Sequence, residues 1–287
     1  MLRYANRIQS LSYFTNYMNV RFKSDRRVLV PDYSLRTKPG KTISIEVAEY
    51  SDLGLIESYC KEHFVTNEPL SVFHEVDPMR FFTHCLTSVV ESCVRFPYTT
   101  LAFDSGKMIG YNFVWLEVWD KNTEVFPIGG LNDLERLRQK YTKLLKLNND
   151  DPESYLLTTV NHAAYITPNF LPEGDKHIIA HGEMGSVNRE YRHNGVLLAM
   201  IIEGAKQLAQ DKIADYYYAT ATAAATVHLN PTYGLKEVWS MKYKDIKYDG
   251  KNIYGDGVLH DGNDKITINL GKVKEMANYD YVNVKRK

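Results

Sequence analysis

The residues with the clearest chemical meaning lie between His177 and Gln210, where a strand, a polar loop and an amphipathic helix follow one another. The loop Asn188–Asn194 carries Arg192, and Gly195 opens the helix. Backbone N–H groups at a helix start have no intrahelical partner, and the helix dipole is positive there. Glycine lets the backbone approach an anion, and the arginine adds a charge-assisted donor. The sequence therefore predicts a pyrophosphate site, against the alternative of an ordinary loop with a surface arginine.

A carboxylate and a histidine are the candidate proton acceptors. Glu68 stands before a proline between two expected helices, and on physical grounds alone such a residue caps or solvates a loop. His181 lies on the strand before the loop Asn188–Asn194 and Gly195, which we call the phosphate turn. There it would be an alternative base or line an acceptor pocket, although packed strand histidines are more common. No His/Cys spacing predicts a metal site, and Ser186 is not in a nucleophile elbow.

The elements that must position these groups alternate between strands and helices. Polar–apolar alternation and flanking turn residues predict strands at 42–50, 99–103, 108–116, 177–187, 214–221 and 235–243. Capping residues and helical periodicity predict helices at 53–63, from 77 onward, and at 129–147, 152–164, 195–210 and 223–229. The helices at 129–164 form a long insertion, either a functional lid or a solvated elaboration. This order predicts a mixed α/β sheet in one domain.

Length and composition limit the possible domain organisation, partners and compartment of the protein. The chain has 287 residues, no net charge and 44% hydrophobic residues, which fits one large domain with extensions. We expect a basic N-terminal extension at 1–41, the domain itself at 42–245, and a C-terminal hairpin and charged tail at 246–287. Balanced charge gives no argument for nucleic acid as a partner, and no apolar run reaches the roughly 18–20 residues of a membrane span. Three scattered cysteines favour a reducing compartment.

The start of the chain bears on its location in the cell. The first 24 residues contain Arg3, Arg7, Arg21 and Lys23 but no acidic residue. This composition resembles a mitochondrial transit peptide, with a basic arm as the equally open alternative. We therefore expect a cytoplasmic protein, or a mitochondrial one if this segment is a targeting signal.

Val187-x-x-x-Tyr191-Arg192-x-x-Gly195 resembles motif A of the GNAT superfamily of acetyltransferases. The resemblance implies a mixed, mostly antiparallel twisted sheet flanked by helices and splayed between the motif A strand and the next strand. It implies acetyl-CoA as co-substrate, with its pantetheine arm along a strand that carries a bulge. Carried over to this sequence, the cofactor-binding residues are Gly185, Val187, Arg192, His193, Asn194, Gly195, Val196 and Leu197. Glycine is frequent in the family where His193 stands, and glycine or alanine where Leu197 stands.

Phe64-x-x-x-Glu68-Pro69-Leu70 is similar to the arylalkylamine N-acetyltransferases of the insect dopamine-acetylating type, which share the long helical insertion. The resemblance implies that Glu68 is the general base. Two serines that follow the strand after motif A in that family align with Thr222 and Thr226, and one of them is proposed to protonate the leaving thiolate. Helix capping or packing is an equally open interpretation of both threonines.

The expected chemistry follows from the acidity of amines. A primary amine has a pKa of about 10 and must lose a proton before it attacks a thioester, which a carboxylate such as Glu68 would accept. We expect direct acetyl transfer from acetyl-CoA to a small, arylalkylamine-like primary amine, without a metal. Two other functions stay open: a non-catalytic CoA-binding regulatory module, and an acetyltransferase that acts on a protein or a polyamine.

Overall fold

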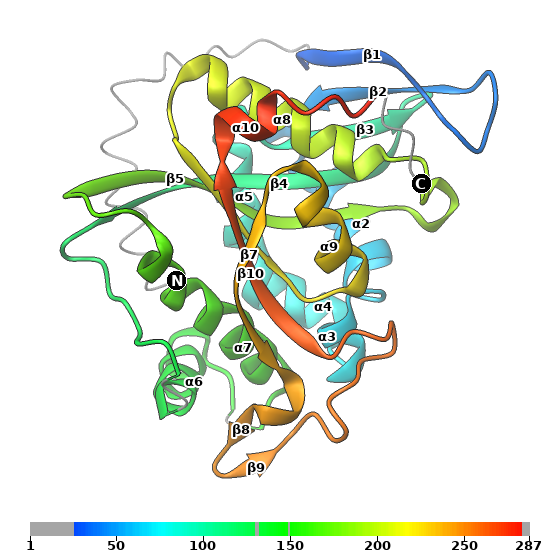
Figure 1. Cartoon of the computed structure of the whole chain (residues 1–287). Helices are drawn as coiled ribbons and strands as arrows, with labels where there is room; N and C mark the ends of the chain where they lie inside the picture. Colours follow the sequence, from blue (N-terminus) through cyan, green and yellow to red (C-terminus); the bar gives the residue numbers. More distant parts are fainter. Residues whose placement is uncertain (1–25, 130–131, 149, 283–287) are drawn as a thin grey trace.

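An eight-stranded mixed sheet forms the centre of the computed structural model, which describes residues 26–129, 132–148 and 150–282 (Figure 1). Its strand order is β1-β2-β3-β4-β5-β6-β10-β7, and only β5 and β6 pair in parallel. The strands are β1 (Val28–Ser34), β2 (Thr42–Val47), β3 (Thr100–Asp104), β4 (Lys107–Asp120), β5 (Lys176–Val187), β6 (Tyr216–Ala221), β7 (Lys236–Lys242) and β10 (Lys265–Lys272). The predicted mixed, mostly antiparallel sheet is confirmed.

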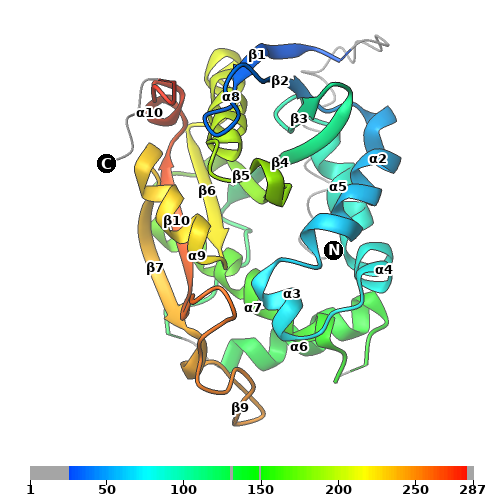
Figure 2. The same ribbon diagram turned by 90° about the vertical axis from the view of Figure 1, so that its right-hand side faces the viewer.

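Helices cover both faces of this sheet, so the central strands β3 and β4 are buried on both sides (Figure 2). Along β4, Val114 and Leu116 pack toward α8, whereas Phe113 and Trp115 pack toward α5 and its neighbours. Successive side chains of a strand point to opposite faces, which explains the nearly continuous apolar run of this strand. One face carries α8 (Val196–Asp211) and α10 (Val273–Ala277); the other carries α2 (Leu53–Tyr59), α3 (Pro69–Phe73), α4 (Pro78–Phe81), α5 (Thr87–Val94), α6 (Asn132–Leu145) and α7 (Pro152–Ile166).

The sheet opens between β5 and β6. The two strands pair only from Ile179 to Gly182 on β5, after which β5 continues on β4 alone as far as Val187. A bulge marks the point of divergence: Phe113 lies opposite Met184 and Val114 opposite Gly182, so Glu183 is the extra residue. Both the splay and the bulge implied by the motif A resemblance are therefore present.

The helical layer before β3 is more broken than the periodicity predicts. α2 passes into a π-helical turn at Cys60–Phe64, and α4 passes into another at Phe82–Leu86 before α5 begins. Between these two stretches, Glu68 caps the short helix α3, with Pro69 at its first position. The Asn67–Pro69 break therefore both ends one helix and starts another.

Both flanking segments contribute strands to the main sheet. β1, within the expected extension at 1–41, pairs with β2, and β10, within the expected tail at 246–287, lies between β6 and β7. The tail also contains the short hairpin of β8 (Lys247–Tyr248) and β9 (Lys251–Asn252). The basic segment at 1–24 lies outside the described residues. No helix among the described residues is long and apolar enough to cross a bilayer.

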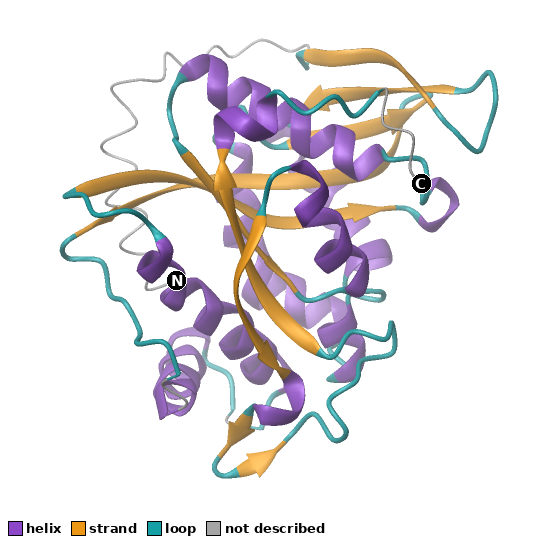
Figure 3. Ribbon diagram, viewed as in Figure 1, coloured by secondary structure: helices purple, strands orange, loops and turns teal. Residues whose placement is uncertain are grey.

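The insertion is part of the core. Figure 3 shows α6 and α7 beside the lower part of the sheet. Tyr165 and Ile166 of α7 are buried in the same apolar core as Val89 and Val90 of α5. Burial of the apolar face of α7 therefore stabilises the fold. This helix is neither a lid nor a solvated elaboration.

His74, at the end of α3, connects this layer to the C-terminal segment. Its Nε2 lies 3.2 Å from the Tyr254 hydroxyl, and its ring stacks on Tyr155. Burial lowers the pKa of His74 from 6.5 to about 4, because the imidazolium loses its hydration. Between these pH values the unfolded chain binds a proton that the folded protein excludes, so stability falls as the pH falls.

We expect this residue to remove on the order of 2 kcal/mol of unfolding free energy between pH 6.5 and about 4. His74→Gln keeps a polar side chain without the titration, so its stability should depend less on pH across this window. Urea denaturation of both proteins measures the difference, and parallel profiles would contradict it. His181 does not interfere, because its pKa is raised and its contribution is lost only as the pH rises.

Candidate active site

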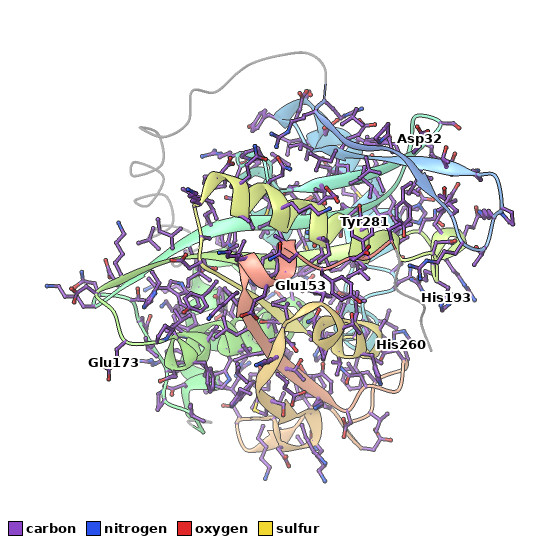
Figure 4. The ribbon with its side chains drawn as sticks, turned by 45° about the horizontal axis from the view of Figure 1, so that its top comes forward. Asp32, Glu153, Glu173, His193, His260 and Tyr281 are labelled. Carbon is purple, nitrogen blue, oxygen red and sulfur yellow. The ribbon has the colours of Figure 1, made fainter. Side chains whose placement is uncertain are left out.

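A cavity of about 630 Å³ opens where β5 and β6 diverge. Its wall comes from β5, the start of α8, the helix α9 (Ala224–Leu229) and the segment between α2 and α3. Most of the predicted site residues line it: Glu68, Gly185, Val187, Arg192, His193, Gly195, Val196, Leu197, Thr222 and Thr226. Asn194 and His181 do not. Figure 4 shows two lining residues, His193 from the turn and His260 from the segment before β10, on the same side of the molecule.

The phosphate turn has the backbone that an anion site requires. Gly195 is the N-cap of α8 with φ of +76°, and His193 also has a positive φ, of +64°. The first helical bond runs from the Ala199 N–H to the Gly195 carbonyl, so the preceding N–H groups of the helix have no intrahelical acceptor. These donors, the helix dipole and the Arg192 guanidinium fit the pyrophosphate of acetyl-CoA. The left-handed backbone explains why glycine suits position 193 in related motifs.

Asn194 supports this turn from inside. Its buried side chain donates from Nδ2 to the carbonyls of Tyr191 (3.2 Å) and Arg192 (3.1 Å). Its Oδ1 accepts from the backbone N–H (2.8 Å) and the hydroxyl (3.1 Å) of Thr37. The Tyr33 hydroxyl donates to the Asn194 carbonyl at 2.8 Å. The β1–β2 hairpin therefore holds the shape of the turn, a role that the sequence did not predict for it.

Asn194→Ala should cost about 3 kcal/mol of unfolding free energy, because it leaves several buried backbone groups without partners. CoA affinity should fall as well, since the turn loses its support. Denaturant titration and calorimetric CoA binding measure the two effects. Asn122→Ala, at an exposed position, is the control and should change stability by less than about 0.5 kcal/mol. Wild-type stability and affinity in the Asn194 variant would contradict the supporting role.

The bulky Leu197 is accommodated by a glycine on the neighbouring strand. A Cβ atom added at Gly185 would lie 2.7 Å from Leu197 Cδ1. The two residues are therefore matched in size, with the leucine side chain packed over the strand. Gly185 thus has a packing role beside its place in the cavity wall.

Glu68 and Thr222, 154 residues apart in sequence, meet at the cavity. The Thr222 hydroxyl donates to Glu68 Oε1 at 2.9 Å. The other carboxylate oxygen accepts from the backbone N–H (2.6 Å) and the hydroxyl (2.8 Å) of Ser71. Three donors thus fix the orientation of this carboxylate. Glu68 therefore caps a helix, as its position before a proline suggested, and its carboxylate also lines the cavity.

The two threonines differ in their bonding. Thr226 donates its hydroxyl to the Ala223 carbonyl at 2.9 Å, a local contact within the first turn of α9. Thr222 instead has its carbonyl held by the Tyr243 hydroxyl (3.1 Å) and the Asn263 side chain (2.5 Å). Asn263 and Tyr243 were not predicted as site residues, because they flank a boundary that the sequence placed at the end of the domain.

His181 lies behind the cavity wall in a buried polar cluster. Its ring stacks on Tyr218, with centroids 4.0 Å apart, and its Nδ1 lies 3.1 Å from Glu117 and 2.9 Å from Glu183. Burial opposes charge on the imidazole, but the two carboxylates outweigh it and raise the pKa of His181. Across the described ranges, no group of three or more His, Cys, Asp or Glu side chains is arranged to hold a metal ion.

Asn112, on β4, is a cavity residue that the sequence did not single out. Its side chain is 3% exposed, and its Nδ2 has no hydrogen-bond partner among the described residues. A buried amide without a partner is costly, and the Tyr217 hydroxyl is the polar group that interacts with this side chain. The available signal was one amide within the apolar run of residues 108–116.

Comparison with known proteins bears on the fold. No protein-family model and no curated protein matches the chain. Among solved structures, arylalkylamine N-acetyltransferase 2 from Aedes aegypti is similar, with 18% identity, a TM-score of 0.57, and 80% of this chain and 99% of that chain covered. An agmatine N-acetyltransferase, at 13% identity and a TM-score of 0.58, is similar over the same shares of the two chains.

A third structure is that of the Drosophila melanogaster polyamine N-acetyltransferase, which catalyses the formation of N-acetylagmatine. It shares 12% identity and a TM-score of 0.55, with 80% of this chain and 99% of that chain covered. At these identities the likeness concerns the fold, and it agrees with the splayed sheet and the bulge described above. The chain therefore has the fold of the GNAT acetyltransferases.

Proposed function

We propose that the protein transfers the acetyl group of acetyl-CoA to a small primary amine of the arylalkylamine type. One observation carries the proposal: the hydrogen bond between Glu68 and Thr222 places a fixed carboxylate in the same cavity as the phosphate turn. The turn supplies CoA binding, and the carboxylate supplies the proton acceptor that an ammonium group requires. Holding both substrates in one cavity provides the orientation that the reaction needs.

Glu68 takes the first proton, from the ammonium group of the acceptor. The neutral nitrogen then forms a bond to the thioester carbonyl carbon, and the carbon–sulfur bond breaks. The thiolate leaves with a proton that the nitrogen gives up, directly or through the Thr222 hydroxyl, which already donates to Glu68 at 2.9 Å. Acetyl-CoA supplies the activated acyl group, and no metal takes part in these steps.

The residues for charge stabilisation come from β5. Beyond Gly182 this strand pairs with β4 alone, so N–H groups on its other edge have no partner strand among the described residues. Donors of this kind, fixed in place before the reaction, stabilise the negative charge that develops on the carbonyl oxygen. The bulge at Glu183 exposes this edge at the point where the cavity begins.

The test is a reaction of purified protein with acetyl-CoA and two groups of amines, arylalkylamines and polyamines. We expect release of free CoA thiol, and mass spectrometry should find the acetylated arylalkylamine. If the protein acetylates polyamines and no arylalkylamine, the acceptor is a polyamine. CoA binding by calorimetry without turnover on any amine would overturn the proposal and leave a CoA-binding regulatory module.

A further inference from the structure

Three carboxylates lie on the cavity wall away from the phosphate turn. Glu68, Glu183 and Asp261 line the cavity, whereas Arg192, on the turn, is the one lysine or arginine among its described lining residues. The Asp261 carboxylate already accepts from two backbone N–H groups, at 2.7 and 3.1 Å. Glu68 has a role in the proposed function. Glu183 is therefore the carboxylate of this wall whose role is unassigned.

Glu183 lies at the bulge of β5, on the face of the sheet that also carries α2–α5. A bulge interrupts the alternation of a strand and redirects the side chain of its extra residue. Met184, the next residue, packs against the core that contains α2–α5, the helices among which Glu68 is found. His181, the residue two before, contacts the Glu183 carboxylate at 2.9 Å. Glu183 therefore extends from the face of the sheet that carries the proposed base.

A buried network holds Glu183 in place. His181 lies between Glu183 and Glu117, and the Glu117 carboxylate accepts from Trp119 Nε1 (2.7 Å) and the Tyr218 hydroxyl (2.9 Å). With the imidazole protonated, one positive charge stands between two carboxylates, which leaves one net negative charge. Of these three charged groups, Glu183 alone lines the cavity, with 19% of its side chain exposed.

We propose that Glu183 binds the ammonium group of the acceptor as an ion pair before Glu68 removes the proton, with His181 and Glu117 as positioning residues. The inference rests on the proposed acetyl transfer and assigns the acceptor-binding site within it. A half-buried carboxylate attracts an ammonium more strongly than an exposed one, because less water screens the pair. Fixed support from His181 lowers the entropic cost of that pairing.

The test uses calorimetric binding of phenethylamine to the full chain saturated with CoA. Glu183→Gln should weaken amine binding by about tenfold or more, and His181→Gln should weaken it by a smaller factor. In steady-state assays Glu183→Gln should raise the amine KM and leave kcat within about twofold, since it removes ground-state binding. Glu173→Gln removes a carboxylate from the exposed segment before β5, away from the cavity, and should change neither quantity.

The variants separate this inference from the proposed function. Glu68→Gln should lose turnover yet still bind phenethylamine, whereas Glu183→Gln should show the reverse. Glu183→Asp keeps the charge and should recover part of the affinity. Amine binding within twofold of wild type in Glu183→Gln, or no amine binding by the wild type, overturns the inference. So does a parallel loss of CoA affinity in Glu183→Gln, because Glu183 would then support the strand.

Discussion

Replacing Glu68 by glutamine is expected to lower kcat by about 10²- to 10³-fold, the range that general-base catalysis supplies. Glutamine has nearly the same shape and still offers an oxygen to the Ser71 N–H, which the carboxylate now holds at 2.6 Å. The helix cap therefore survives while the proton acceptor is lost. Steady-state kinetics with acetyl-CoA and phenethylamine give kcat, and calorimetry should give an unchanged CoA affinity.

Asp77→Asn is the matched control for this variant. Asp77 caps α4 as Glu68 caps α3, accepting from the Arg80 N–H at 2.7 Å, but it does not line the cavity. We expect it to lose a few tenths to about 1 kcal/mol of stability and no activity. A Glu68→Gln enzyme as fast as wild type would assign the base elsewhere, and equal losses in both variants would point to helix capping.

Gly195→Ala should weaken CoA binding by about ten- to a hundredfold, which corresponds to about 1.4–3 kcal/mol. The residue has φ of +76°, a left-handed conformation that alanine adopts only at a cost. An added Cβ would also lie 2.9 Å from the Tyr33 hydroxyl, which holds the turn through the Asn194 carbonyl. If the backbone shifts to relieve the strained φ or the contact with Tyr33, the N–H donors of the turn move away from the positions that a phosphate needs. Calorimetric titration with CoA measures the loss.

Gly106→Ala separates backbone strain from site geometry. Gly106, in the β3–β4 turn, has φ of +82°, and a Cβ added there meets no atom within 4 Å. This variant should lose about 1 kcal/mol of stability and keep wild-type CoA affinity. Unchanged CoA affinity in Gly195→Ala would show that the turn does not bind the pyrophosphate.

Local patterns in the sequence predicted the elements around the site. The strand at 177–187 and the helix at 195–210 correspond to β5 and α8, because alternation and helical periodicity are properties of contiguous residues. Arg192 and Gly195 could be singled out for the same reason, since a phosphate turn is a short contiguous motif. The family resemblance then predicted the splayed sheet.

Contacts between distant segments could not be predicted in this way. The pairing of β10 with β6 and β7 depends on which strand edges are open in three dimensions, so residues 246–287 were expected to lie outside the domain. The support of Thr222 by Asn263 depends on that placement. The cluster of His181 with Glu117 likewise depends on the register of β4 against β5, which no local pattern encodes.

The position of β10 has a consequence for synthesis of the chain. Ribosomes release β6 and β7 well before Lys272, so the two strands wait with unpaired edges until β10 emerges and fills the space between them. Open edges of this kind invite pairing with other chains. Asn263 arrives with the same segment, so its hydrogen bond to the Thr222 carbonyl forms only then. The nascent chain therefore passes through a stage in which all residues of the phosphate turn, Glu68 and Thr222 have been synthesised, but the Asn263 contact to Thr222 is still missing.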